Sequence, residues 1–200
     1  MSEIHLPYLF VFDSDGKFLN RFPKSKRPVL KKPVGVVFSK DKLYVTDIGD
    51  HKVKVFDKQG KLLLQFGREG SNPGEFRFPV GIASDKSGRI YVADTGNTRV
   101  QVFSSNGKLQ TSTDSLSGVH FNLPRGVAID PWGRIHVVDT AANRIIVFSE
   151  KFKYLFSYGK QGTGKGELGY PNGIGIDEIS GQISVTEQSN NRASVWGYPN

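Results

Sequence analysis

The stretch from residue 89 to residue 103 reads Arg89-Ile-Tyr-Val-Ala-Asp94-Thr-Gly-Asn-Thr-Arg99-Val-Gln-Val-Phe103, and residues 134–148 follow the same plan. A short β-branched and aromatic segment ends on an acid, and a second such segment ends on an aromatic residue nine positions later. This pair recurs with Asp47 and Phe56, and again with Glu187 and Trp196. The pattern predicts two consecutive short strands joined by a turn, four times over.

Further repeated features extend this unit on both sides. Before each acid stands Pro-x-Gly followed by Val or Ile, beginning at Pro33, Pro79, Pro124 and Pro171, at spacings of 46, 45 and 47 residues. Turn residues such as Ser87-Gly88 separate this first segment from the second, and Gln59-Gly60 or Asn106-Gly107 lead into a fourth. Four short strands per unit, each unit covering its neighbour's face, predict an all-β fold of β-propeller blades.

The repeat count predicts a single domain over residues 1–200 with about four blades. Strands of a partial blade are expected in residues 6–32, and blades in 33–78, 79–123, 124–170 and 171–198. The first segment, Leu9-Phe-Val-Phe12, aligns with third strands, so four first, four second, five third and four fourth strands are expected. We interpret this as a window of a longer propeller or as a chain that closes by self-association through open blade edges; a distorted four-blade ring is the remaining alternative.

Composition limits the classes of function. The chain has no cysteine, which excludes disulfides and thiolate chemistry. Its early apolar run is too short for a membrane span, and no other segment suggests one. The net charge of +8 favours acidic partners or anionic surfaces.

The combination of motifs resembles the NHL-repeat family. The residues that carry the likeness are Ile-Tyr-Val-Ala-Asp94-Thr-Gly-Asn97-Thr-Arg99-Val-Gln-Val-Phe103, its counterpart ending at Phe148, and the spacer from Phe66 to Phe76. The resemblance spans residues 6–198 and is nearest to bacterial NHL proteins. It implies blades of a six-bladed propeller, incomplete at this length, and an extracytoplasmic location, with any anchor outside this segment.

Most polar residues of the repeat have a structural interpretation. The acids Asp47, Asp94, Asp139 and Glu187 recur in every blade, so they are expected to accept backbone N–H groups of their own turns. Lys52, Arg99, Arg144 and Arg192 are expected to pair with acids or carbonyls. The histidines, His5, His51, His120 and His136, lack ligand spacing, and the glycine-rich segment 159–167 lacks the order of a phosphate loop. We therefore assign no catalytic residue, no metal ligand and no cofactor.

One asymmetric feature is a basic stretch without acids between residues 17 and 40. It is expected to be either a solvated loop or an electrostatic platform for an anionic polymer, with nucleic acid as a possible ligand. Its candidate binding residues are Lys17, Arg21, Lys24, Lys26, Arg27, Lys31 and Lys32.

Loop residues that differ between blades form the second candidate set. They are His51, Arg68, Arg125, Trp132 and Tyr170. Trp132 stands at a turn where the other repeats have small or charged residues, so it either packs on the next blade or anchors a partner.

The sequence thus favours a non-catalytic scaffold that binds a protein or an anionic polymer through loops on one face. Two alternatives stay open. One is an extracytoplasmic metal-dependent hydrolase or lyase that uses the central channel, as some propeller enzymes with this resemblance do. The other is RNA binding through the basic face.

Overall fold

The computed structural model describes residues 6–25, 28–113 and 118–197, and these form five antiparallel sheets. The first sheet holds β1 (Leu9–Phe12) and β2 (Phe18–Phe22). The second holds β3 (Pro33–Ser39), β4 (Lys42–Asp47), β5 (Lys52–Phe56) and β6 (Leu62–Phe66). The third holds β7 (Pro79–Ser84), β8 (Ile90–Asp94), β9 (Arg99–Phe103) and β10 (Leu109–Ser112).

The remaining strands complete the array. The fourth sheet holds β11 (Pro124–Ile129), β12 (Ile135–Asp139), β13 (Arg144–Phe148) and β14 (Tyr154–Tyr158). The fifth holds β15 (Pro171–Ile176), β16 (Ile183–Glu187) and β17 (Arg192–Trp196). Two short 3₁₀ helices, η1 (Thr95–Asn97) and η3 (Thr140–Ala142), join second to third strands. No helix of the described residues has the length and apolarity of a membrane span.

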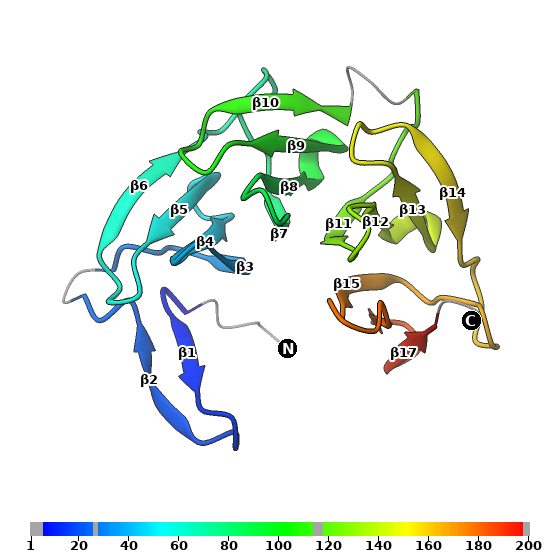
Figure 1. Cartoon of the computed structure of the whole chain (residues 1–200), viewed down its shortest axis with the longest axis horizontal. Coiled ribbons are helices and arrows are strands. Elements are labelled where there is room, and N and C mark those ends of the chain that lie inside the picture. Colours follow the sequence, from blue (N-terminus) through cyan, green and yellow to red (C-terminus); the bar gives the residue numbers. More distant parts are fainter. Residues whose placement is uncertain (1–5, 26–27, 114–117, 198–200) are drawn as a thin grey trace.

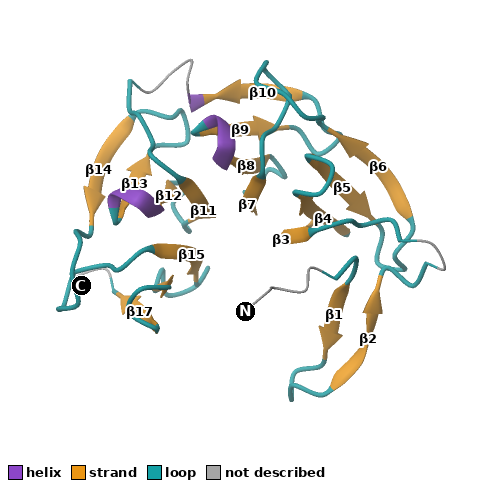
Figure 2. Cartoon of the chain, turned by 180° about the vertical axis from the view of Figure 1, so that it is seen from behind, coloured by secondary structure: helices purple, strands orange, loops and turns teal. Residues whose placement is uncertain are grey.

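The five sheets stand around an arc as propeller blades (Figure 1). The first strands of the blades, β3, β7, β11 and β15, face the centre, and fourth strands such as β6 and β14 form the rim; the view from behind shows the same order (Figure 2). The all-β blade architecture is confirmed, and the strands occupy the expected four, four, five and four positions. The arc is open between the β1–β2 sheet and the β15–β17 sheet, so the described residues do not form a closed four-blade ring.

The glycine of each Pro-x-Gly motif allows neighbouring blades to meet at the centre. A Cβ on Gly35 would overlap the carbonyl oxygen of Val80, and one on Gly81 would overlap that of Arg125. A Cβ on Gly126 would lie 2.8 Å from the carbonyl oxygen of Asn172. In the first three motifs, backbone of the next blade therefore fills the space of a side chain, whereas a Cβ on Gly173 would meet the Oγ1 of Thr186 in its own blade.

The hydrophobic core lies between blades rather than within them. Tyr44 and Val55 of the second sheet pack with Phe103 of the third, and equivalent clusters join the third to the fourth and the fourth to the fifth. Third-strand aromatics show the effect of this packing. Phe103 is 1% exposed between two blades, whereas Phe12, at the same repeat position in the terminal sheet, is 55% exposed. A blade face is thus buried only where a neighbour covers it.

Candidate functional site

The loops of the blades divide between two faces of the arc. The spacers that link one blade to the next (23–32, 67–78, 118–123 and 159–170) lie beside the turns between second and third strands (48–51, 95–98, 140–143 and 188–191). A backbone hydrogen bond joins spacer to turn in each blade, as in Gly96 N to the Arg77 oxygen, 2.8 Å, and Thr140 N to the Leu123 oxygen, 3.0 Å. We call this the spacer face. Because the strands are antiparallel, the other hairpin turns lie on the opposite side, the turn face.

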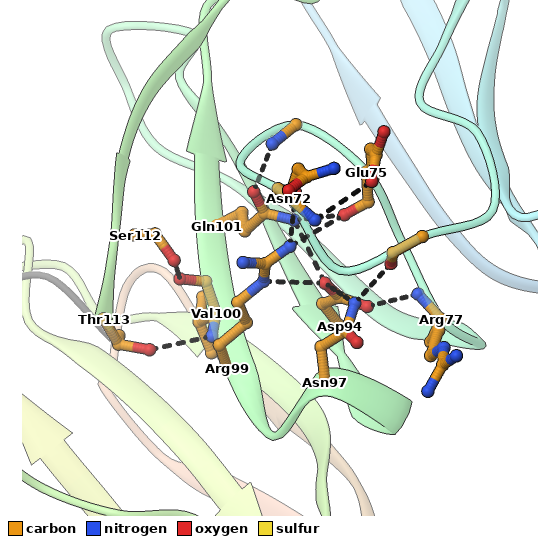
Figure 3. A network of polar contacts seen from close by, with 12 residues as sticks. Asn72, Glu75, Arg77, Asp94, Asn97, Arg99, Val100, Gln101, Ser112 and Thr113 are labelled. Atoms are coloured by element: carbon orange, nitrogen blue, oxygen red, sulfur yellow. Dashed lines mark hydrogen bonds and ion pairs between the residues drawn. The ribbon is translucent and has the colours of Figure 1, made fainter.

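The repeated acids fasten the spacer face to the blades. Asp94 accepts Arg77 N at 2.7 Å and the Nε of Arg99 at 2.9 Å, and the Nδ2 of Asn97 also donates to it (Figure 3). Glu187 accepts Gly169 N, and Asp139 accepts the N–H groups of Asn122 and Leu123. Each of these acids therefore accepts at least one hydrogen bond from a backbone N–H group of the spacer that precedes its blade. The expected bond to its own turn is formed by Asp47, which accepts Gly49 N.

Buried charge partners set the acidity of these carboxyl groups. Burial alone would raise the pKa of Glu187, but donation from Arg192, Ser194, Gly169 and Asn190 outweighs it and lowers this pKa to about 2. At Asp47, burial is likewise outweighed by Lys54 and by the N–H groups of the spacer, so the pKa is lowered. At Asp94, burial prevails over its donors and raises the pKa. These groups hold the blade together and leave little capacity for a ligand.

The basic column of the third strands pairs largely as expected. Arg99, Arg144 and Arg192 form ion pairs with the acid opposite, with N···O distances of 2.9, 3.5 and 2.8 Å. In the second sheet the partner of Asp47 is Lys54, at 2.7 Å, rather than Lys52. Lys54 is 2% exposed and was missed in the sequence because it stands two residues further along the strand.

Four of the five loop candidates belong to the spacer face. Arg68 is on a spacer and pairs with Glu75 at 2.7 Å. His51 lies in a second turn, where its Nδ1 accepts Phe78 N at 3.0 Å; Asn143 does the same for Tyr170 N at 2.7 Å. His51 and Asn143 therefore each bind the N–H of the residue before a proline, Phe78 and Tyr170 respectively. Phe78, 54% exposed at the repeat position of Tyr170, was overlooked although the shared position would have revealed it.

Arg125 is the second residue of β11, at the inner end of the spacer face. It lines a groove of about 340 Å³ formed by the first strands of four blades. The equivalent residues are Val34, Val80 and Asn172, so a charge enters the groove in one blade. We call this the channel groove.

Trp132 is separate from the others because its turn lies on the turn face. The ring is 61% exposed, and the guanidinium of Arg134 lies 4.8 Å from its centre. A neighbouring blade therefore leaves most of the ring uncovered.

The structure divides the basic stretch. Lys24, Lys31 and Lys32 are exposed on the first spacer, and Arg21, at the end of β2, lies over the Tyr8 ring at 4.5 Å. Lys17 belongs to the β1–β2 turn on the turn face. Lys26 and Arg27 lie outside the described residues. The stretch thus contributes mainly, but not entirely, to the spacer face.

The spacers carry an excess of positive charge. Their described residues include seven Lys or Arg and three Asp or Glu. Two of the acids are bound internally: the N–H of Asn72 and Arg68 lower the pKa of Glu75, and the N–H of Gly164 and Lys160 lower that of Glu167. The charges left to face a ligand are therefore predominantly basic.

Comparisons with known proteins agree with the blade architecture. The family model of the NHL repeat matches residues 76–103, and that of a family described as a 6-bladed beta-propeller matches residues 127–193. A streptogramin B lyase structure aligns at a TM-score of 0.66 and 16% identity, covering 97% of this chain and 63% of that one. A chain of a nidogen/laminin complex aligns at 0.69 and 22% identity, covering 89% and 64%. At these identities the likeness shows the fold, and the chain spans less than two thirds of either.

Proposed function

We propose that this chain, an NHL-repeat β-propeller, is a non-catalytic scaffold whose spacer face binds a protein or an anionic polymer. The observation that carries the proposal is the convergence of His51, Arg68, Arg125 and Tyr170 with the exposed lysines Lys24, Lys31 and Lys32 on one side of the arc. Loops on a rigid framework are where binding residues concentrate. The structural neighbour from a nidogen/laminin complex supports the choice, since it is a propeller found in a protein complex.

The charge distribution supports an acidic ligand. The acids that bind the spacers to the blades, Asp47, Asp94 and Glu187, form ion pairs with a Lys or Arg of the same blade. Lys24, Lys31 and Lys32 are exposed, and apart from a 4.0 Å contact between Lys31 and Asp50 they form no ion pair with another described residue. Such a patch attracts anionic partners over about a Debye length, roughly 8–10 Å at physiological salt.

The two alternatives have weaker support. The groove at the centre is lined by apolar and amide side chains and Arg125, with neither carboxylate nor imidazole among its described lining residues. This donor set does not suit a divalent cation. Phe22, the aromatic residue between Arg21 and Lys32, packs on Phe56 with ring centres 5.4 Å apart, so it is not presented for stacking on bases.

A charge-reversal pair tests the proposed face. The variant K24E/K31E/K32E changes three exposed lysines of the spacer face, and K17E/K61E/K108E changes three exposed lysines of the turn face by the same total charge. With heparin as the probe, the spacer variant should lose at least about tenfold in affinity at 50 mM salt, and the control about threefold or less. The two variants change the net charge equally, so the difference measures direct contacts between the spacer-face lysines and the sulfate groups of heparin. Equal losses in both variants would contradict a face-specific site.

A further inference from the structure

Arg125 differs from Arg99 and Arg192 because it forms no ion pair with an acid among the described residues. Its side chain lines the channel groove beside the apolar first-strand residues Val80, Val127 and Ile174. The backbone beneath it is fixed, because the Arg125 carbonyl fills the space that a side chain on Gly81 would need. The guanidinium is thereby presented from a rigid strand at the inner end of the spacer face.

Two contacts fix the orientation of the guanidinium. Its Nη1 donates to the Oδ1 of Asn172 at 2.7 Å, and its central carbon lies 5.8 Å from the centre of the Tyr170 ring. The Nε is buried without a hydrogen-bond partner, and Nη2 donates no hydrogen bond to any of the described residues. None of the ion pairs within the described part of the chain includes Arg125. The Nε and Nη2 therefore have no partner within the described chain, the Nε is closed off from solvent, and the guanidinium is reached from the channel groove that Arg125 lines.

Elsewhere in the molecule the Nε of arginine side chains binds carboxylates. The Nε of Arg68, Arg99 and Arg192 donates to Glu75, Asp94 and Glu187 at 2.8, 2.9 and 2.8 Å. Arg89 and Arg134 do the same with Asp85 and Asp130, both at 2.5 Å. A hydrogen bond between a guanidinium and a carboxylate is among the strong ones, and a buried donor left without a partner costs about 1–3 kcal/mol. Arg125 carries the same donor without an acid among the described residues.

We propose that the guanidinium of Arg125 binds, from the channel groove, a carboxylate carried by a peptide segment of a protein partner, with Asn172 and Tyr170 holding the guanidinium in place. The inference rests on the proposed function and names the chemistry of its ligand. A peptide suits the site because one cation is set among apolar walls, which accept an acidic side chain flanked by apolar ones. A polyanion would instead require several cations along the groove.

Binding of fluorescein-labelled hexaglutamate to the full chain tests the assignment by fluorescence anisotropy. The matched variants are R125Q and R77Q, since Arg77 is exposed on the same face and its side chain forms no hydrogen bond or ion pair with another described residue. R125Q should weaken binding about tenfold and R77Q by less than about twofold, because a charge-assisted hydrogen bond inside the groove contributes more than a screened surface charge. Circular dichroism verifies that both variants are folded.

A third variant separates geometry from charge. R125K keeps the positive charge but lacks the paired donors, so it should bind hexaglutamate nearly as weakly as R125Q. Wild-type affinity in R125K, equal affinity in R125Q and R77Q, or no binding of hexaglutamate to the wild-type chain at about millimolar concentration would each overturn the proposal. Tighter Arg125-dependent binding of oligogalacturonate or inorganic phosphate would show that the ligand is not a peptide. If the K24E/K31E/K32E variant still loses heparin affinity, the scaffold function survives such a failure.

Discussion

Arg99 and Arg125 lie in neighbouring blades and meet opposite surroundings. Arg99 is 4% exposed, and its guanidinium donates to Asp94 and to the spacer carbonyls of Asn72 and Glu75 (Figure 3). Arg125 donates to one amide oxygen and faces the channel groove without an acid. The pairing of a third-strand arginine with an acid recurs in the third, fourth and fifth sheets and neutralises the charge of the arginine. The arrangement of Arg125 occurs once among the described blades, and its charge has no acidic partner there. Polar residues that recur in every blade therefore have structural roles, whereas Arg125, which differs from its counterparts in the other blades, is a candidate for ligand binding.

The largest effect is expected from breaking the closed arrangement. D94N places an NH₂ group among donors and removes the carboxylate that the buried Nε of Arg99 binds, so the free energy of unfolding should fall by about 3–5 kcal/mol. The control is D41N, because Asp41 pairs with Lys58 at 2.7 Å on the surface, with side chains 79% and 56% exposed. That variant should lose about 0.5 kcal/mol or less in urea unfolding. Similar losses in the two variants would refute the structural role of the repeated acid.

The hydrogen bonds that Glu187 accepts should make the stability of the protein depend on pH. Its pKa is about 2 in the fold against 4.5 ordinarily, so its contribution is complete above about pH 4.5 and is lost as the pH falls toward 2. The wild-type free energy of unfolding should therefore fall in this window by about 3 kcal/mol more than that of E187Q, since one pKa unit corresponds to about 1.4 kcal/mol. Equal pH slopes in the two proteins would show that the Arg192 and Ser194 contacts do not bind the carboxylate as described.

A smaller effect is expected at the wall of the channel groove. G81A introduces a methyl group where the Arg125 carbonyl lies, so the blades must separate, at a cost of about 1–3 kcal/mol in unfolding free energy. Gly175 also lies on a first strand, but no described atom lies within 4 Å of the place that a Cβ would take there, and G175A should therefore be nearly neutral or slightly stabilising. Thermal unfolding of both variants measures the difference. A G81A protein as stable as G175A would contradict the close approach of the blades.

The repeat made the fold predictable, and its interruptions made the binding face only partly so. Pro-x-Gly, the acids and the third-strand aromatics each recur because every blade solves the same packing problem, and the strand positions follow from them. Strand topology decides on which face each loop lies. The spacing of the repeats alone did not predict that Lys17 and Trp132 lie on the turn face, apart from the other candidates. The role of Lys54 depends on its contacts with Asp47 on the paired strand and with the Val29 carbonyl of the spacer. The surroundings of Arg125 depend on its contact with Asn172 in the next blade, and no local pattern encodes such contacts.

The most direct test of ligand binding at the Arg125 guanidinium is its side-chain Nε–Hε resonance in a ¹H–¹⁵N NMR spectrum, assigned by its absence in R125K. Titration with unlabelled hexaglutamate should shift this resonance and leave that of Arg99 unchanged, because the Arg99 Nε is already bound to Asp94 at 2.9 Å. An unchanged Arg125 resonance at saturating peptide, or an equal shift of both arginines, would contradict carboxylate binding by Arg125.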